Sequence, residues 1–228
     1  MAPLEHDIYG IDIETDLSRG TIDPALAPIR AIGVSVRNAE DTFTGDEASI
    51  LRQVDARLAE LPPGIVATWN GAIFDLPYIA DRARVLGVAL DLVLCADRRR
   101  RSARELLPGH DGAYRATWGE HRHVDTFRLY GDSGSSGTLG SLLGLPRRRA
   151  ATIASTDDLL NEALHAHAAS DARLARVLAE RRRQAALRLV DHIGDDEDAV
   201  RLDRIGGRSR VTGLRERAGG VRLRPAIA

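Results

Sequence analysis

An α/β or α+β domain is the architecture indicated by this chain of 228 residues. Short apolar, β-branched runs come first, and similar runs then alternate with stretches in which apolar residues recur at helical spacing. Strands followed by alternating helices are typical of a sheet covered by helices. The length is sufficient for one full domain with a tail.

Local signals place the individual elements. Asp46 is expected to cap a helix that reaches about Leu61, and a second helix from about Leu76 is expected to end at Gly87. Strands are expected at residues 7–14, 29–37, 41–44, 65–68 and 88–95, a short strand or turn at 124–127, a loop or lid at 97–120, a short helix at 139–145, and one helix, or two that meet near His165, at 157–189.

The end of the chain is expected to form a tail. An acidic cluster at residues 195–198 precedes residues 201–228, which hold eight arginines against two acids. Such a segment is expected to have low order. We therefore predict a domain over residues 1–190 and an acidic-then-basic tail over residues 191–228.

Composition excludes several classes of protein. No apolar run approaches the roughly 20 residues that span a bilayer, and the N-terminus does not resemble a signal peptide, so neither membrane contact nor export is expected. Cys95 is the only cysteine, which excludes an internal disulfide and a cysteine-based zinc site and fits the cytoplasm. All 32 basic residues are arginine. Two runs of them, Arg98–Arg101 with Arg104 and Arg147–Arg149, are individually typical of solvated surface but would together suit a polyanionic substrate.

Asp12 and Glu14 are the most informative residues. They lie in the run Asp7–Thr15, whose apolar and β-branched residues are typical of a buried strand. Side chains two positions apart on a strand point to the same face. Two carboxylates in such a place are costly unless a cation compensates them, and Mg²⁺ and Mn²⁺ prefer oxygen ligands. The pair therefore indicates a metal-dependent active site at the end of a central strand.

Two further segments carry acids that can join this pair. Residues 69–79 begin at a strand end and place Asp75 at the start of a helix. In the long C-terminal helical segment, His167 and Asp171 lie one turn apart on the same face. Acids around two divalent ions about 3.5–4 Å apart suit phosphodiester cleavage, because the ions activate a water and stabilise the leaving oxygen. A neutral histidine can accept the proton of that water.

The three segments resemble the exonuclease motifs of the DEDD superfamily, which has a ribonuclease-H-like fold. Asp12 and Glu14 match the first motif, and Asp171 matches the final acid. Residues 69–78, W-N-G-x-x-F-D-x-P-Y, are similar to the second motif of the exonuclease domains of family B DNA polymerases and their stand-alone bacterial relatives. The resemblance covers roughly residues 7–185. It implies a mixed sheet flanked by helices, two Mg²⁺ or Mn²⁺ ions, and removal of nucleotides from 3′ ends.

The resemblance also assigns expected roles, with one departure from the family pattern. The family has tyrosine four positions, or histidine five positions, before the final acid, whereas this chain has His167 four positions before Asp171. His167 is the expected general base, and His165 is a weaker rival on another helical face. The resemblance implies Asp12, Glu14, Asp75 and Asp171 as metal ligands, and Thr15, Asn70, Phe74 and Tyr78 as residues that position the terminal nucleotide.

Structural interpretations stay open beside these roles. Asp75 is also a candidate helix cap, Asp171 a candidate surface acid paired with arginine, and His167 a candidate for a partly buried helix histidine. Asp125 is a fifth acid candidate, as a supporting group or substitute ligand, although a structural turn is favoured. The remaining residues considered are favoured as structural: His121 and His123, which lack the spacing of a metal site, and Trp69 and Trp118, which are expected in the core.

The main hypothesis is a stand-alone 3′–5′ exonuclease of the cytoplasm that acts on single-stranded nucleic acid, DNA rather than RNA. Proofreading would require a partner, such as a polymerase or repair protein. One alternative is a catalytically weak or inactive nucleic-acid-binding module with the same fold, which the histidine at position 167 motivates. A second alternative is an unrelated metal-dependent phosphohydrolase that acts on small nucleotides.

Overall fold

The structure is a computed structural model that describes residues 7–16, 18, 20–97, 106–131, 136–142, 144–145 and 157–193. Its strands are β1 (Asp7–Thr15), β2 (Ile29–Val36), β3 (Ala39–Thr44), β4 (Gly64–Thr68), β5 (Leu92–Asp97), β6 (Ala113–Trp118) and β7 (His121–Asp125). Its helices are α1 (Glu47–Glu60), α2 (Asp75–Leu86), α3 (Phe127–Tyr130), α4 (Ser136–Leu142), α5 (Asp157–Arg181) and α6 (Arg183–Leu189). Within these described ranges, no helix has both the length and the apolar character needed to cross a membrane.

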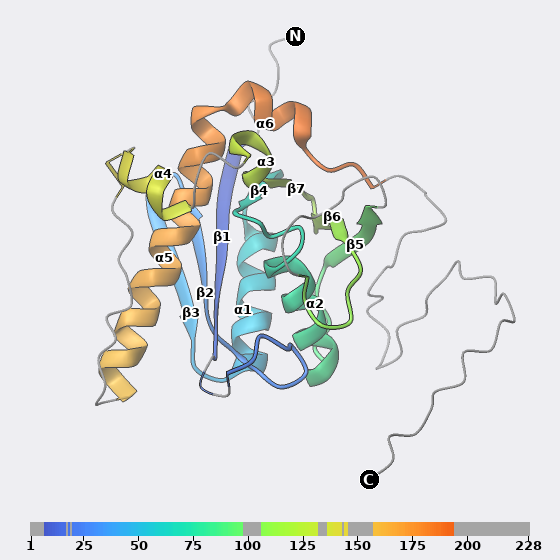
Figure 1. The fold of residues 1–228 in the computed structure, drawn as a ribbon, viewed down its shortest axis with the longest axis vertical. Helices are drawn as coiled ribbons and strands as arrows, with labels where there is room; N and C mark the ends of the chain where they lie inside the picture. The colour runs from blue at the N-terminus through green and yellow to red at the C-terminus, as the bar shows by residue number, and fades with distance from the viewer. Residues whose placement is uncertain are drawn as a thin grey trace, which may run out of the picture.

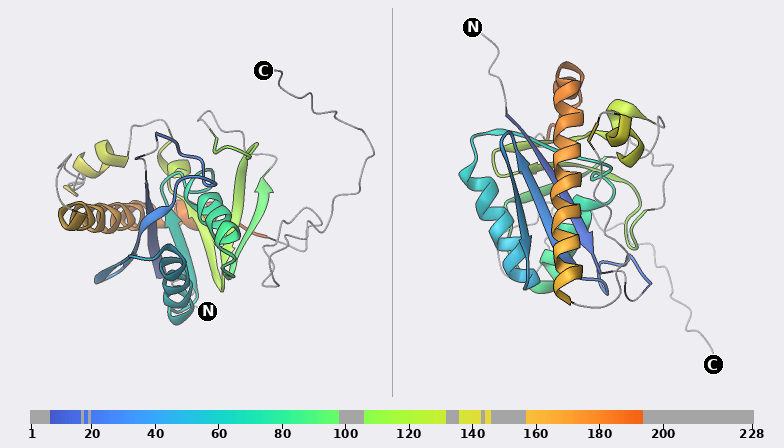
Figure 2. Two further views of the ribbon diagram at one scale, coloured as in Figure 1. Left: turned by 90° about the horizontal axis from the view of Figure 1, so that it is seen from below. Right: turned by 90° about the vertical axis from the view of Figure 1, so that its left-hand side faces the viewer.

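The strands form one mixed sheet in the order β3-β2-β1-β4-β7-β6-β5. β4 runs parallel to β1, and β7 runs parallel to β4, whereas the other neighbours are antiparallel. Helices α1 and α2 cover one face of the sheet, and the long helix α5 crosses the other (Figures 1 and 2). The layered α/β architecture expected from the sequence is therefore confirmed.

Two of the expected helix ends are confirmed. The Asp46 carboxylate caps α1 by accepting a hydrogen bond from the Ser49 N–H at 2.9 Å. Gly87 ends α2 in the left-handed conformation, with a φ of 65° that favours glycine. The inner face of α1 consists of the four apolar residues that its spacing predicts, Ile50, Leu51, Val54 and Leu58.

The prediction of a loop or lid at residues 97–120 is wrong for its second half, which contains a strand. Residues 113–118 form β6, which pairs with β5 and buries Ala113, Ala116 and Trp118. Polar and small residues within this strand hide its alternation, so pairing with β5 decides the conformation rather than local propensity. β5 itself begins at Leu92, later than the expected position 88.

The C-terminal helical segment does not break near His165. α5 continues without interruption to Arg181, and the chain turns at Arg182, where φ is −117° and ψ is 34°. The turn lets α6 pack Ala186 against a second apolar cluster on the α5 side of the sheet, which contains Ile8 and Ile65. Tertiary packing therefore sets the position of this break.

The end of the described chain docks on the sheet. Asp191 is buried, its N–H donates to the His123 carbonyl oxygen at 2.8 Å, and its carboxylate lies 2.8 Å from His123 Nδ1. The same carboxylate accepts a hydrogen bond from the Ala116 N–H at 3.2 Å. We therefore propose a domain boundary beyond Asp191 instead of at residue 190. The tail from residue 194, and the runs Arg98–Arg101 with Arg104 and Arg147–Arg149, lie outside the described residues.

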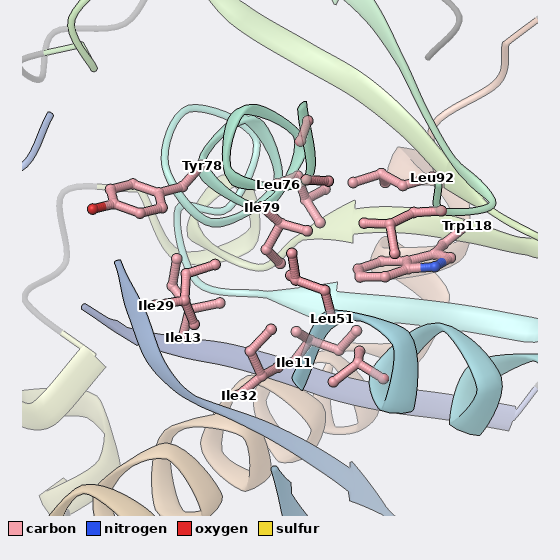
Figure 3. Close-up of a cluster of buried hydrophobic side chains, with 14 of the residues drawn as sticks. Ile11, Ile13, Ile29, Ile32, Leu51, Leu76, Tyr78, Ile79, Leu92 and Trp118 are labelled. Atoms are coloured by element: carbon pink, nitrogen blue, oxygen red, sulfur yellow. The ribbon is translucent and has the colours of Figure 1, made fainter. Parts of the chain in front are cut away.

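The main apolar core lies between the sheet and helices α1 and α2 (Figure 3). Ile11 and Ile13 of β1 point into it and meet Leu51 of α1 and Ile79 of α2. Because side chains alternate along a strand, the residues between them in β1 must face the opposite side, where α5 lies. The core thus fixes the orientation of β1.

Helix α5 packs with its backbone almost on the strands. A Cβ atom added at Gly10 of β1 would lie 1.8 Å from the Ala172 carbonyl oxygen, and one added at Gly33 of β2 would lie 2.3 Å from that of Ala168. Any side chain at either position would push the helix away. Glycine is therefore required at both positions for α5 to approach this closely.

Substitution Gly10→Ala should destabilise the domain, because the added methyl group overlaps the backbone of α5. We expect a loss of about 1–3 kcal/mol, as for an overpacked core, and a fall in melting temperature of roughly 2–4 °C for each kcal/mol. Thermal unfolding of both proteins measures this. Gly112→Ala is the matched control, because a Cβ there meets no atom within 4 Å. Equal melting temperatures for Gly10→Ala and the wild type would show that the close approach is not needed.

Candidate active site

Asp12 and Glu14 project from β1 on the side that α5 covers. β4 pairs with β1 only as far as Gly10, so the C-terminal half of β1 extends beyond its parallel neighbour. Both acids lie in this extension and are partly exposed. The predicted arrangement, two carboxylates on one face near the end of a central strand, is confirmed.

Helix α5 brings two more of the predicted residues to this place. The turn of α5 from Ala168 to Ala172 lies directly on β1 and β2. His167, at the start of this turn, contacts Glu14 through Nδ1 and the carboxylate atom Oε1. Asp171 lies one turn further along the same side of the helix and is buried. It therefore occupies the part of α5 that crosses β1 beside Asp12.

Asp75 reaches the same end of β1 from α2. It is the first residue of the helix, and the cap position belongs to Phe74, so Asp75 does not act as the helix cap. Its carboxylate accepts a hydrogen bond from the Ile13 N–H, and its acidic neighbours are Asp125 and Glu14. Burial, reinforced by these two negative charges, raises the pKa of Asp75 from the usual 3.8 to about 7. Near neutral pH this carboxyl group is therefore protonated in part of the molecules, and a cation would compete with the proton for it.

Asp125 holds the loop that carries the second motif. Asn70 in this loop has a φ of 67°, a left-handed conformation that asparagine tolerates better than most residues. Asp125 Oδ1 accepts hydrogen bonds from the N–H groups of Asn70 at 2.8 Å and Phe127 at 3.1 Å. The next residue, Thr126, donates both its N–H and its hydroxyl to the Thr68 carbonyl oxygen. The favoured interpretation of Asp125 as a structural turn is confirmed, and the turn secures this loop.

The residues predicted to position a nucleotide differ in exposure. Thr15, Asn70 and Phe74 are partly exposed near the acids. Tyr78 is fully buried, and its hydroxyl donates to the Ala27 carbonyl oxygen at 2.7 Å. Burial raises the pKa of Tyr78 to about 12, so this hydroxyl remains a donor. The expectation that Tyr78 touches substrate therefore needs correction: its ring supports that of Phe74, with 5.5 Å between centroids, from within the core.

Three other histidines, His165, His121 and His123, bind groups outside this site. His165 Nε2 lies 2.8 Å from Thr44 Oγ1, on the side of α5 that faces β3. His121 accepts from the Gly64 N–H through Nδ1 and donates to the backbone through Nε2. Both ring nitrogens of His123 are engaged by Asp191 and a threonine hydroxyl. The pair at 121 and 123 is structural, as favoured from the sequence.

Trp118 has the core position expected for it, whereas Trp69 is only partly buried. Trp118 is buried in the main core, and its indole N–H donates to Asp55 at 2.8 Å. Trp69 packs edge-on against Phe127, with 5.5 Å between ring centroids, and against the apolar cluster between α4 and α5. Trp69 thus links the second motif to α3.

The donor set has the chemistry of a divalent-cation site. Among the described residues, no three His, Cys, Asp or Glu side chains stand close enough to hold a metal ion in their present orientations. A carboxylate of β1 nevertheless acts on one of α2, since Glu14 contributes to the raised pKa of Asp75, and hard cations such as Mg²⁺ prefer oxygen ligands. The charged groups that shift the pKa of Asp75 are all negative. A cation would therefore relieve an electrostatic cost that the fold creates at this point.

Comparison with known proteins shows what this chain is similar to. Residues 23–106 match the family model described as DNA polymerase family B, exonuclease domain. DNA polymerase 2 of Aeropyrum pernix is 32% identical over 87 residues, which are 36% of this chain and 11% of that protein. A family B DNA polymerase from the hyperthermophilic archaeon Pyrobaculum calidifontis superposes with a TM-score of 0.60 and 21% identity, over 78% of this chain and 25% of that one.

These findings support a family B exonuclease-like domain. The structural similarity, at this low identity, establishes the ribonuclease-H-like α/β fold that the motifs implied. The chain spans only about a tenth of the curated polymerase and a quarter of the solved one. The activity of this exonuclease-like domain therefore has to be argued from its own residues.

The raised pKa of Asp75 predicts how pH and metal affect stability. The folded protein holds a proton on Asp75 up to about pH 7, whereas the unfolded chain releases it near pH 4, so stability falls as pH rises through this window. A divalent cation needs the ionised carboxylate, so Mn²⁺ should raise the melting temperature more at about pH 7.5 than at about pH 5.5. Thermal unfolding with Mn²⁺ and with EDTA measures the difference. In Asp75→Asn the pH-dependent part should disappear; a Mn²⁺ effect that is equal or larger at acid pH in the wild type would contradict the assignment.

Proposed function

We propose that this family B exonuclease-like domain is a 3′–5′ exonuclease that hydrolyses phosphodiester bonds at the 3′ ends of single-stranded nucleic acid. The observation that supports this most is the position of Glu14 near the end of β1, where it contacts His167 of α5 and contributes to the raised pKa of Asp75 of α2. DNA is the proposed substrate in preference to RNA, because the relatives that match are DNA polymerases. The proposed unit is the domain that includes the docked Asp191, with the following residues as a separate tail.

The proposed cofactors are two Mg²⁺ or Mn²⁺ ions, held by Asp12, Glu14, Asp75 and Asp171. When bound, such ions supply an activated water and stabilise the leaving oxygen. The protein would keep these carboxylates ionised and directed to the ions, which requires side-chain rearrangement on binding. Asp125 would keep the loop before Asp75 in register while this rearrangement occurs.

His167 is the proposed general base. Its Nδ1 contacts Glu14, so Nδ1 carries the proton that it shares with this carboxylate, and Nε2 is the basic nitrogen. A carboxylate on one ring nitrogen orients the imidazole and raises the basicity of the other. His167 could then take a proton from the attacking water through Nε2. The contact with Glu14 would therefore orient His167 for this proton transfer.

The terminal nucleotide would lie over the loop between β4 and α2. The partly exposed ring of Phe74 offers a stacking surface for a base, and Tyr78 behind it keeps the ring in place. Asn70 and Thr15 would supply polar contacts to the sugar and phosphate. Any role in proofreading or repair would depend on a polymerase or repair partner that binds the same strand.

The alternative function is a nucleic-acid-binding module that has weak turnover or none. It is motivated by His167, which stands where the matching family motif has tyrosine. This module would bind single strands in a salt-dependent manner and release no product at any metal concentration. Measurements of binding and cleavage on the same oligonucleotide separate the two functions.

Asp12→Ala should abolish cleavage, because it removes an acid from the centre of the site. With Mn²⁺, the wild type should shorten a 5′-labelled single-stranded DNA stepwise from its 3′ end, and the variant should be slower by at least about a hundredfold. Gel electrophoresis of timed samples measures both rates. Asp111→Ala, which removes an exposed acid from a loop, is the matched control. Undiminished cleavage by Asp12→Ala would rule out this mechanism.

Replacement of His167 tests the proposed base. His167→Ala should lower kcat by about 10²–10⁴-fold and leave KM within a few-fold of the wild type, since proton transfer is lost and substrate contacts remain. His167→Tyr, which places the residue of the family motif at this position, should recover part of the rate. His165→Ala is the control, because His165 faces β3 instead of the acids. If His167→Ala turned over as fast as His165→Ala, another group would have to accept the proton.

A further inference from the structure

Four exposed arginines gather where α3 meets the end of α5 and α6, and we term them the arginine face: Arg128, Arg181, Arg182 and Arg188. Two hydrogen bonds join these elements. Arg182 donates to the Leu129 carbonyl oxygen at 2.6 Å, and Arg128 donates to that of Leu189 at 3.0 Å. Figure 1 shows α6 lying across α3 beside the end of α5. The four side chains therefore belong to one compact area of the surface.

The charge of the arginine face is poorly neutralised by the protein. The side chains of Arg182 and Arg128 donate to backbone carbonyl groups. The Asp191 carboxylate, 3.6 Å from Arg128, is already bonded to His123. In the described part of the chain, the side chains of Arg181 and Arg188 form no ion pair or hydrogen bond, and α6 contains no acid. Since the whole chain has a net charge of only −1, this is a local excess of positive charge.

A continuous line of side chains joins this surface to the candidate active site. The Arg182 guanidinium stacks over the Tyr130 ring, 4.6 Å from its centroid, and the Tyr130 ring lies 6.5 Å from that of Trp69. Trp69 directly precedes Asn70 of the second motif. The arginine face is therefore an extension of the proposed site and not a remote patch.

The rise of α5 gives the distance between the acids and the arginine face. Arg182, which directly follows the end of α5, comes eleven positions after Asp171, and eleven residues of helix correspond to about 16 Å along the axis. A stacked strand advances about 3.4 Å per nucleotide, so this distance corresponds to about five nucleotides.

We propose that the arginine face binds the phosphodiester backbone of a single strand about five nucleotides upstream of the 3′ end held at the acids. The inference rests on the proposed function for the position of that 3′ end. Arginine is suited to this contact, because its planar guanidinium binds phosphate oxygens in a bidentate manner. Arg181 and Arg188 are the side chains best placed to bind phosphate, since Arg182 and Arg128 also hold α3.

Charge reversal tests the arginine face without disturbing the bonds that hold α3. Fluorescence anisotropy in EDTA would measure the affinity of the wild type, Arg181→Glu and Arg188→Glu for a labelled single-stranded DNA of about 20 nucleotides at several salt concentrations. Each reversal should reduce the slope of log affinity against log salt by about 0.7 or more, the value of one lost phosphate contact. The loss of affinity should be small for a strand of about three nucleotides, which cannot reach from the acids to this surface.

Arg52→Glu is the matched control, because Arg52 is exposed on α1, on the other face of the sheet, and its reversal changes the net charge by the same amount. The slope of log affinity against log salt for Arg52→Glu should equal that of the wild type. Equal slopes for all four proteins, or equal losses in all three variants, would overturn the inference even if the wild type degrades DNA. Reduced slopes in Arg181→Glu and Arg188→Glu alone would support it, even if the wild type shows no cleavage and the proposed function fails. No binding of the long strand by the wild type would overturn the inference as well.

Discussion

The backbone contact between α5 and the first two strands is the constraint on which the proposed site depends. Because Gly10 and Gly33 have no side chains, the turn from Ala168 to Ala172 lies against the strands themselves. At that distance His167 of the helix contacts Glu14 of β1, and Asp171 lies one turn further along the same side. A helix held one side chain further away would leave these groups too far apart to act together.

Two buried acids of this fold, Asp191 and Asp75, have opposite electrostatic surroundings. Asp191 is buried, but its carboxylate is bound by His123 Nδ1 and the Ala116 N–H, and its own N–H donates to the His123 carbonyl oxygen. These bonds fasten the end of the described chain to the sheet. Asp75 is equally buried, yet the charges around it are negative and its pKa is raised. An unrelieved cost of this kind is expected at sites that bind a cation or proton and not at sites that only stabilise a fold.

Sequence patterns were sufficient wherever local chemistry decides the structure. The alternation in β1, the cap at Asp46 and the stop at Gly87 are signals that need no distant partner, and each is confirmed. β6 was missed because its conformation is decided by pairing with β5, and the break at Arg182 was misplaced because it depends on where α6 packs. For the site, spacing predicted that Asp12 and Glu14 share a face, but it could not reveal that Tyr78 is buried against the Ala27 carbonyl group. It could not reveal the hydrogen bond from the Asn70 N–H to Asp125 either, because their separation in the chain carries no local signal.

The family match and the geometry support different parts of the proposal. The matched segment, residues 23–106, contains only Asp75 among the four acids, so the comparison by itself leaves the rest of the site unassigned. Asp12 and Glu14 precede that segment, and His167 and Asp171 follow it. The fold supplies the missing connection, because β1 and α5 pack against each other where these residues lie and His167 touches Glu14. This contact joins position 167 to a carboxylate near the end of the central strand, and it is the observation that supports the proposed role of His167 although its side chain departs from the family pattern.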